Sequence, residues 1–283
     1  MGAKEFLGRI LVPIDASTSS LMAEETAVLI AKKTGATVTV LHIQQELRIG
    51  YRLPQNVQDE LLGSIEQHAN MIITNARALF TEEKVKVDAE TFSGDPADGI
   101  LEFSKKDYDL IVMGARGENE KDAYALGSVT KKVIMHTGCP TLIVKKVSPI
   151  SSLLVCVDGS ENSVKALDYA LKLAEKMGSK ITLLNVQERR LYESSPKTAE
   201  ELSDKIFSKA LDAVGKKKIK VDKKLEFGVT SDSIVEVAEK GNYDLIVLGS
   251  RGLGTVKRFL LGSISDYVSH KAKCSVLIVP AKK

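Results

Sequence analysis

Short apolar runs alternate with amphipathic segments along this chain of 283 residues. Residues 9–14 and 37–43 have the length and the β-branched composition of buried strands. The segment between them has apolar residues at helical spacing and ends at Gly35, a residue type typical of helix C-termini. Repeated strand–helix alternation predicts an α/β fold, with a parallel sheet that helices cover on both faces.

The same pattern occurs twice. Residues 9–17, which contain Ile-Asp-Ala-Ser, correspond to residues 152–160, which contain Val-Asp-Gly-Ser. We therefore predict one domain at residues 1–146, a linker at 147–151 and a second domain at 152–283. Further strands are predicted at residues 85–92, 108–113 and 141–144 of the first half, and at 180–186, 219–227, 244–248 and 275–279 of the second.

The halves differ around their second helix. The first half is longer here, and residues 46–58 are predicted to begin as a loop that carries the extra residues. Beyond this loop, apolar residues from Leu61 to Leu79 recur at helical spacing and predict a long helix. The corresponding helix of the second half is predicted at residues 196–214.

A glycine-rich sequence follows the fourth predicted strand of each half. Gly114-Ala-Arg-Gly117 is followed after nine residues by Gly127-Ser128, and Gly249-Ser-Arg-Gly252 by Gly262-Ser263. Glycines let backbone N–H groups approach an anion, and a helix that begins after them adds further donors. A plain turn is the better explanation of one such loop taken alone, but the repetition of the loop at the same spacing favours a phosphate site.

This spacing, G-x2-G-x9-G-S, resembles the signature of ATP-binding members of the universal stress protein family, and the likeness covers essentially the whole chain. The resemblance implies two doubly wound, Rossmann-like domains, each with a five-stranded parallel sheet in the order 3-2-1-4-5. Ligands in such sheets bind beyond the strand carboxyl ends, where strands 1 and 4 are neighbours. Because domains of this family pair through their last strands, we expect an intramolecular pseudo-dimer, with further homodimerisation of the whole chain as an additional possibility.

The resemblance also implies ATP, accompanied by Mg²⁺ or Mn²⁺, as the ligand of both halves. Each half is then expected to have three groups of residues. One contacts the nucleoside, one contacts the ribose and the α-phosphate, and one contacts the outer phosphates. In the first half these residues are Pro13, Asp15, Ile43, Met113, Gly114, Gly117, Gly127, Ser128 and Val129. In the second half they are Cys156, Val157, Asp158, Val186, Leu248, Gly249, Gly252, Gly262, Ser263 and Ile264.

Several of these residues have structural alternatives. Asp15 and Asp158 are also candidates to cap the helix that follows them, and Ser128 and Ser263 are candidates for N-caps. His42, at the end of the second strand, is either a ligand contact or a half-buried structural residue. The four histidines have no metal-ligand spacing, and the three cysteines are expected to be buried thiols.

Three functions agree with these patterns. The leading one is a regulatory protein whose bound ATP alters conformation or the choice of partner. The second is a slow ATPase or a self-phosphorylating protein, although no paired carboxylates or Ser-His-Asp pattern support catalysis. The third is a scaffold whose pockets are degenerate and which acts by pairing.

Composition limits the partners and the location. The net charge of +3 is too close to balance to indicate nucleic acid, and the chain has no apolar run long enough to span a membrane. With no signal-peptide pattern at residues 1–14, a cytoplasmic protein is expected.

The charges of the loops beside the two pockets predict that the pockets differ in how they bind ATP. Residues 118–126 contain three acids and one lysine, whereas residues 253–261 contain Lys257 and Arg258 and no acid. Carboxylates near a triphosphate weaken its binding. We therefore expect the first pocket to bind ATP more weakly, to need a divalent ion more strictly, or to prefer a less charged ligand.

Overall fold

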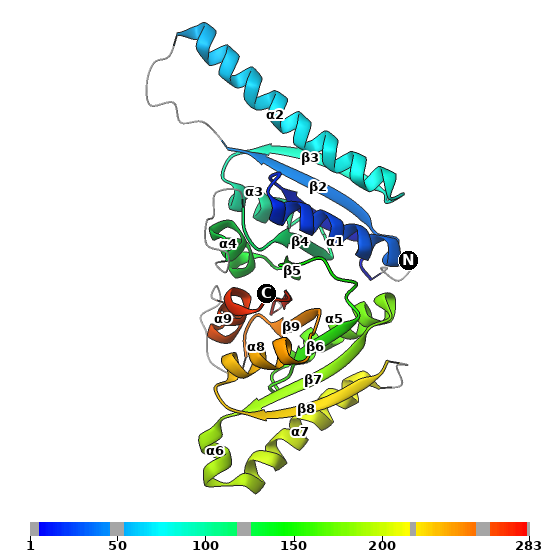
Figure 1. Ribbon diagram of the computed structural model, residues 1–283, viewed down its shortest axis with the longest axis vertical. Coiled ribbons are helices and arrows are strands. Elements are labelled where there is room, and N and C mark those ends of the chain that lie inside the picture. The colour runs from blue at the N-terminus through cyan, green and yellow to red at the C-terminus, as the bar shows by residue number, and fades with distance from the viewer. Residues whose placement is uncertain (1–5, 46–53, 118–125, 216–218, 253–260, 282–283) are drawn as a thin grey trace.

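A computed structural model describes residues 6–45, 54–117, 126–215, 219–252 and 261–281. Two α/β halves lie end to end along the long axis of the molecule (Figure 1). In the first half the elements are β1 (Arg9–Ile14), α1 (Thr18–Thr34), β2 (Thr37–Gln44), α2 (Gln55–Glu82), β3 (Val87–Ser93), α3 (Pro96–Phe103), β4 (Leu110–Gly114), α4 (Ser128–His136) and β5 (Thr141–Val144).

The second half repeats this order and adds one short helix. Its elements are β6 (Ser152–Cys156), α5 (Glu161–Met177), β7 (Lys180–Gln187), α6 (Arg189–Ser194), α7 (Pro196–Val214), β8 (Val221–Phe227), α8 (Thr230–Lys240), β9 (Leu245–Gly249), α9 (Ser263–Lys271) and β10 (Ser275–Val279). The sequence pattern did not predict α6. It also placed the start of α2 too late, because the helix begins at Gln55, ahead of its apolar stripe.

The strands form one ten-stranded sheet in the order β3-β2-β1-β4-β5-β10-β9-β6-β7-β8. Within each half the strand order is 3-2-1-4-5 and the neighbours are parallel, which confirms the predicted fold class. One apolar core lies between the sheet and helices α1, α2, α5 and α7 and is continuous across both halves. On the opposite face, α3 and α4 cover the first half, and α8 and α9 cover the second.

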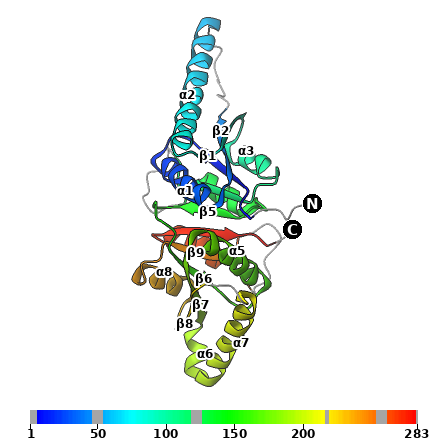
Figure 2. The same cartoon turned by 90° about the vertical axis from the view of Figure 1, so that its right-hand side faces the viewer.

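The halves join along β5 and β10, which pair antiparallel with Leu142 opposite Leu277. Figure 2 shows these two strands side by side at the middle of the molecule. This pairing forms the expected pseudo-dimer and leaves neither strand as an open edge. Lys145 strengthens the junction, because its Nζ donates to the carbonyl oxygens of Ala272 (2.7 Å) and His270 (3.0 Å). Burial lowers the pKa of this lysine to about 8.

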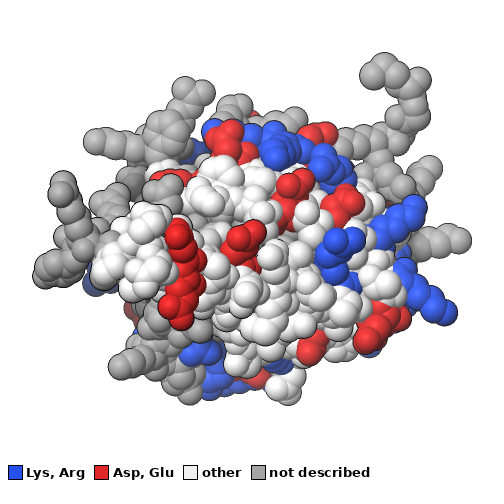
Figure 3. Space-filling model, turned by 90° about the horizontal axis from the view of Figure 1, so that it is seen from above, with Lys and Arg blue, Asp and Glu red and all other residues white. Residues whose placement is uncertain are grey.

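Helix α2 is the most prominent difference between the halves. It has 28 residues, whereas α7 has 19, and its N-terminal part projects beyond the sheet (Figure 1). The view from above, in Figure 3, shows acidic and basic residues interspersed around a broad area without charge. Among the described residues, no helix is both long enough and apolar enough to cross a membrane.

Candidate functional site

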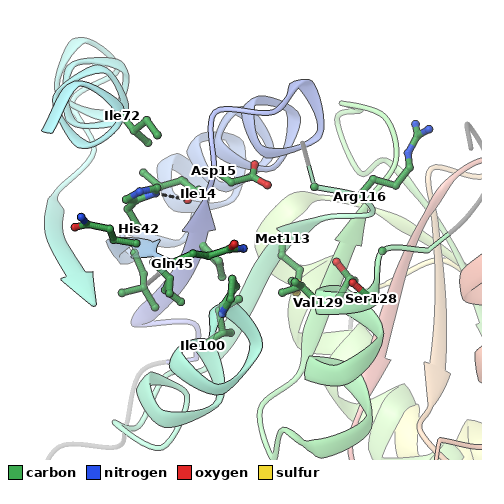
Figure 4. A pocket seen from close by; sticks show the side chains of 18 of the residues that line it. Ile14, Asp15, His42, Gln45, Ile72, Ile100, Met113, Arg116, Ser128 and Val129 are labelled. Carbon is green, nitrogen blue, oxygen red and sulfur yellow. Dashed lines mark hydrogen bonds between the residues drawn. The ribbon is translucent and has the colours of Figure 1, made fainter. Parts of the chain in front are cut away.

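A cavity of about 580 Å³ lies at the carboxyl ends of β1, β2 and β4, between helices α2, α3 and α4. Figure 4 shows side chains from these elements pointing into it. Parallel α/β sheets bind ligands at this edge, where the connections of β1 and β4 leave in opposite directions. The residues predicted for the first half that line the cavity are Pro13, Asp15, Ile43, Met113, Gly117, Gly127, Ser128 and Val129.

Asp15 follows the last residue of β1 and organises the turn into α1. Its Oδ1 accepts from the backbone N–H of Ser17 (3.1 Å), and the Ser17 hydroxyl oxygen accepts from the N–H of Ser20 (3.1 Å). Ser17 is therefore the N-cap, so the alternative in which Asp15 caps α1 is wrong. In the second half Asp158 makes the same contact with Ser160, at 3.0 Å, and Ser160 caps α5.

The other carboxylate oxygen of each aspartate faces the glycine loop. A Cβ placed on Gly117 would lie 2.9 Å from Oδ2 of Asp15, and one placed on Gly252 would lie 2.6 Å from Oδ2 of Asp158. A side chain at either position would therefore displace the carboxylate. Two segments about 100 residues apart in the sequence thus meet at one point, as expected of strands 1 and 4.

The first glycine of each motif has a packing role. A Cβ on Gly114 would lie 2.7 Å from the backbone of Ser19, and one on Gly249 would lie 3.0 Å from the backbone of Asn162. These glycines let the first turn of α1 or α5 approach the end of the neighbouring strand. Gly114 is buried and does not line the cavity, so this packing accounts for it without a ligand.

Helix α4 begins at the cavity without a side-chain cap. Its N-cap is Gly127 rather than Ser128, and the N-cap of α9 is Gly262 rather than Ser263. The predicted alternative that the serines are N-caps is therefore wrong, since each serine is the first residue of its helix. Because a glycine N-cap has no side-chain oxygen, it leaves first-turn N–H groups to bind an anion.

His42 and Asn185 occupy equivalent positions and make equivalent contacts. His42 Nδ1 lies 3.0 Å from the carbonyl oxygen of Ile14, and Asn185 Nδ2 donates to the carbonyl oxygen of Val157 (2.7 Å). Since a carbonyl only accepts, His42 carries its proton on Nδ1. Both side chains hold the end of strand 1 against strand 2, so His42 has a structural role while it also lines the cavity.

Several lining residues were not predicted from the sequence. They come mainly from α2 and α3, whose distance from the glycine motif cannot be read from spacing alone, whereas Arg116 lies within the motif itself. The helical periodicity of α2 identified its inner face, but not what that face covers. These residues include Gln45, Leu61, Ile65, His68, Ile72, Ile100 and Arg116.

The corresponding cavity of the second half is much smaller, about 70 Å³ among the described residues. Ser203 of α7 donates to the Asn185 side chain (3.0 Å), and Lys209 Nζ donates to the carbonyl oxygen of Gly159 (2.8 Å). These contacts draw α7 onto the strand ends. The predicted residues that line this cavity are Cys156, Val157, Asp158, Val186, Leu248, Gly249, Gly252 and Ile264, whereas Gly262 and Ser263 do not line it.

A buried carboxyl lies behind the first cavity. Glu24 of α1 accepts from the Ser20 hydroxyl (3.2 Å), and that hydroxyl oxygen accepts from the backbone N–H of Asp15 (3.3 Å). Burial raises the pKa of Glu24 to about 7, an effect that the hydrogen bond from Ser20 partly offsets.

The part of the chain that the structure describes contains no cluster of three or more metal-ligating side chains. The charged residues on which the predicted inequality of the pockets depends, including Lys257 and Arg258, lie outside the described residues.

Comparisons with known proteins agree with this architecture. A universal stress protein of Methanocaldococcus jannaschii is 34% identical over 140 residues, which cover 49% of this chain and 82% of that protein. A putative universal stress protein of Staphylococcus aureus is also 34% identical over 140 residues. The crystal structure of a universal stress protein from Archaeoglobus fulgidus covers 97% of this chain and 98% of its own, at 24% identity and a TM-score of 0.75, and shares the fold. Because the family's sequence profile matches residues 7–145 and again residues 150–280, the chain belongs to the universal stress protein family as a tandem, two-domain member.

Proposed function

We propose that the protein is a nucleotide-binding regulator of the stress response, and that the first cavity binds ATP. The observation that carries this proposal is the convergence of three features on one cavity: the Asp15 carboxylate, the Gly117 turn and the uncapped N-terminus of α4. The glycine loop and the helix dipole attract phosphate oxygens. A cytoplasmic location is part of this proposal.

The residues around the cavity fit a nucleotide. Arg116 and the first turn of α4 line one end of the cavity and would bind the phosphate chain, and Ile43 and Ile100 offer apolar surface for a flat base. A volume of about 580 Å³ lies within the range of ~300–1,000 Å³ that small-molecule sites occupy. Pockets of this kind combine apolar walls with a few directed polar groups, as here.

Asp15 is the residue that would hold a divalent ion. Mg²⁺ commonly binds one or two carboxylates together with substrate phosphates, so a cluster of several protein ligands is not required. With Oδ1 engaged by the Ser17 N–H, Oδ2 is the oxygen directed towards the glycine loop. In this arrangement the protein positions the nucleotide and its ion, and bound ATP stabilises one relative arrangement of α1, α4 and the junction.

Replacing each N-cap glycine by aspartate tests the proposal. Gly127 has φ −59° and Gly262 has φ −64°, which L-residues adopt without strain, and aspartate is a favoured N-cap. Gly127→Asp should therefore keep the fold while it places a carboxylate where a phosphate would bind. We expect ATP affinity at the first pocket to fall by about 100-fold in calorimetric titrations, because two like charges would compete for the same donors.

Gly262→Asp is the matched control in the second half and should leave the first-pocket affinity unchanged. Nucleotide released from denatured wild-type protein, identified by mass spectrometry, gives an independent check. Unchanged ATP binding in a folded Gly127→Asp protein would contradict the proposal. Release of phosphate well above background would instead favour the slow-ATPase alternative.

A further inference from the structure

The part of the first cavity farthest from the glycine loop holds most of its aliphatic side chains, beside the polar Gln45 and His68. Leu61, Ile65 and Ile72 of α2 line it, at spacings that place them on one face of the helix. Ile43 of β2 and Ile100 of α3 line it from the other elements. Figure 4 shows Ile72 on α2 and Ile100 on α3 at opposite sides of the cavity, with Arg116 and Ser128 away from both. The cavity therefore has a polar end at α4 and a mainly aliphatic end beneath α2, which is called the apolar end below although His68 also lines the cavity.

In the second half, helix α7 covers the equivalent apolar end. Ala199 of α7 is fully buried, and Ser203 of the same helix is bonded to Asn185. The added helix α6 places Tyr192 against Phe227, with ring centroids 4.1 Å apart. In the first half, by contrast, Leu61 and Ile65 remain only half-buried. Among the residues that the structure describes, this apolar end is thus open in the first half and covered in the second.

The charges fix the direction in which a nucleotide would lie. Phosphates favour Gly117 and the start of α4, where backbone N–H donors lie and Arg116 is the cationic residue among those that line the cavity. The base of the same nucleotide then points towards Ile43 and the apolar end. An unsubstituted purine would leave the α2 face partly in contact with water, and an apolar group attached to the base would cover it.

We infer that the first pocket recognises an adenine nucleotide that carries an apolar substituent on its base, seated against Leu61 and Ile65 of α2. This inference rests on the proposed nucleotide site and adds the chemical class of its ligand. The recognition is specific to the first half, because α7 occupies the corresponding space in the second.

Titration of two nucleotides with one structural difference tests the inference. The full chain carrying Gly262→Asp, which places a carboxylate at the N-cap of α9 in the second half, is titrated calorimetrically with ATP and with N6-benzyl-ATP, each with Mg²⁺. We expect N6-benzyl-ATP to bind roughly tenfold more tightly, as burial of a ring against aliphatic side chains predicts. Adding Ile65→Gln should reduce this ratio to about one. Leu62→Gln, on the outer face of the same helix where Leu62 is 54% exposed, is the matched control and should keep the ratio.

The outcomes separate the two proposals. If ATP binds and N6-benzyl-ATP binds equally or more weakly, the inference is wrong and the nucleotide site stands. If the preference survives Ile65→Gln, the substituent does not lie against α2 and the inference is also wrong. If neither nucleotide binds while the protein remains folded, the proposed function of the first pocket fails together with the inference.

Discussion

The two halves of the chain place the same strands, the same aspartate and the same glycine motif around cavities of about 580 and 70 Å³. Besides the longer α2 of the first half and the added α6 of the second, the halves differ at a few aligned positions beside the shared framework. Ala69 in α2 corresponds to Ser203 in α7. The Ser203 hydroxyl donates to the Asn185 side chain and holds α7 against the end of β7. Glu24 corresponds to Leu167, and Ala16 corresponds to Gly159. The comparison teaches that the motif fixes where a site can form, whereas the second helix decides how much room that site has.

Expressing one half without the other tests the junction between β5 and β10. Of the changes proposed, we expect this separation to have the largest effect on the protein. Residues 152–283 expressed alone would expose the edge of β10 that pairs with β5. We expect a homodimer with a dissociation constant below about 10 μM, equivalent to about −7 kcal/mol, measured by light scattering after size-exclusion chromatography.

The junction also offers a variant that sharpens this test. Pro280 aligns with Lys145, whose ammonium group bonds the carbonyl oxygens at the end of α9. Pro280→Lys should therefore tighten the isolated second-half dimer. A stable monomer at high micromolar concentration would show that the strand edges do not drive the pairing.

Because Glu24 has no acidic counterpart in the second half, we expect it to make the stability of the first half depend on pH. Its folded pKa of about 7 lies above the ordinary value of 4.5, so the folded state binds the proton more tightly than the unfolded state. Stability that is present below pH 4.5 is therefore lost as the pH rises to 7. We expect Glu24→Leu, the residue of the second half, to raise the free energy of unfolding at pH 8 by about 2 kcal/mol.

Urea unfolding at pH 5 and pH 8 checks this expectation. The gain from Glu24→Leu should shrink towards pH 5, where most of the wild-type carboxyl is already protonated in the folded state. Leu167→Glu is the reverse exchange and should destabilise the protein more at pH 8 than at pH 5. An equal gain at both pH values would mean that the buried charge of Glu24 is not its cause.

The turn after each aspartate gives the smallest expected difference. Ala16 has φ +61° and Gly159 has φ +81°, both in the region that favours glycine. Gly159→Ala should destabilise the protein by about 1–2 kcal/mol. A Cβ there would also lie 3.2 Å from the Ile206 side chain. Ala16→Gly should be close to neutral or slightly stabilising in thermal unfolding, because relief of strain opposes the added chain entropy. If Gly159→Ala destabilised the protein by as much as Ala16→Gly stabilised it, backbone strain alone would explain both changes. The contact with Ile206 would then contribute nothing to stability.

The sequence by itself determined the strand–helix alternation and the repeat, and its resemblance to the universal stress protein family predicted the strand order and the meeting of Asp15 with the glycine loop. Hydrophobic periodicity and the repeated glycine spacing depend on local geometry, and each half carries both in full. The tertiary structure alone decided the N-caps at Gly127 and Gly262, the packing role of Gly114 and the openness of the first cavity. These features depend on how closely two elements approach each other. That distance depends on contacts between elements, such as the hydrogen bond from Ser203 of α7 to Asn185 of β7.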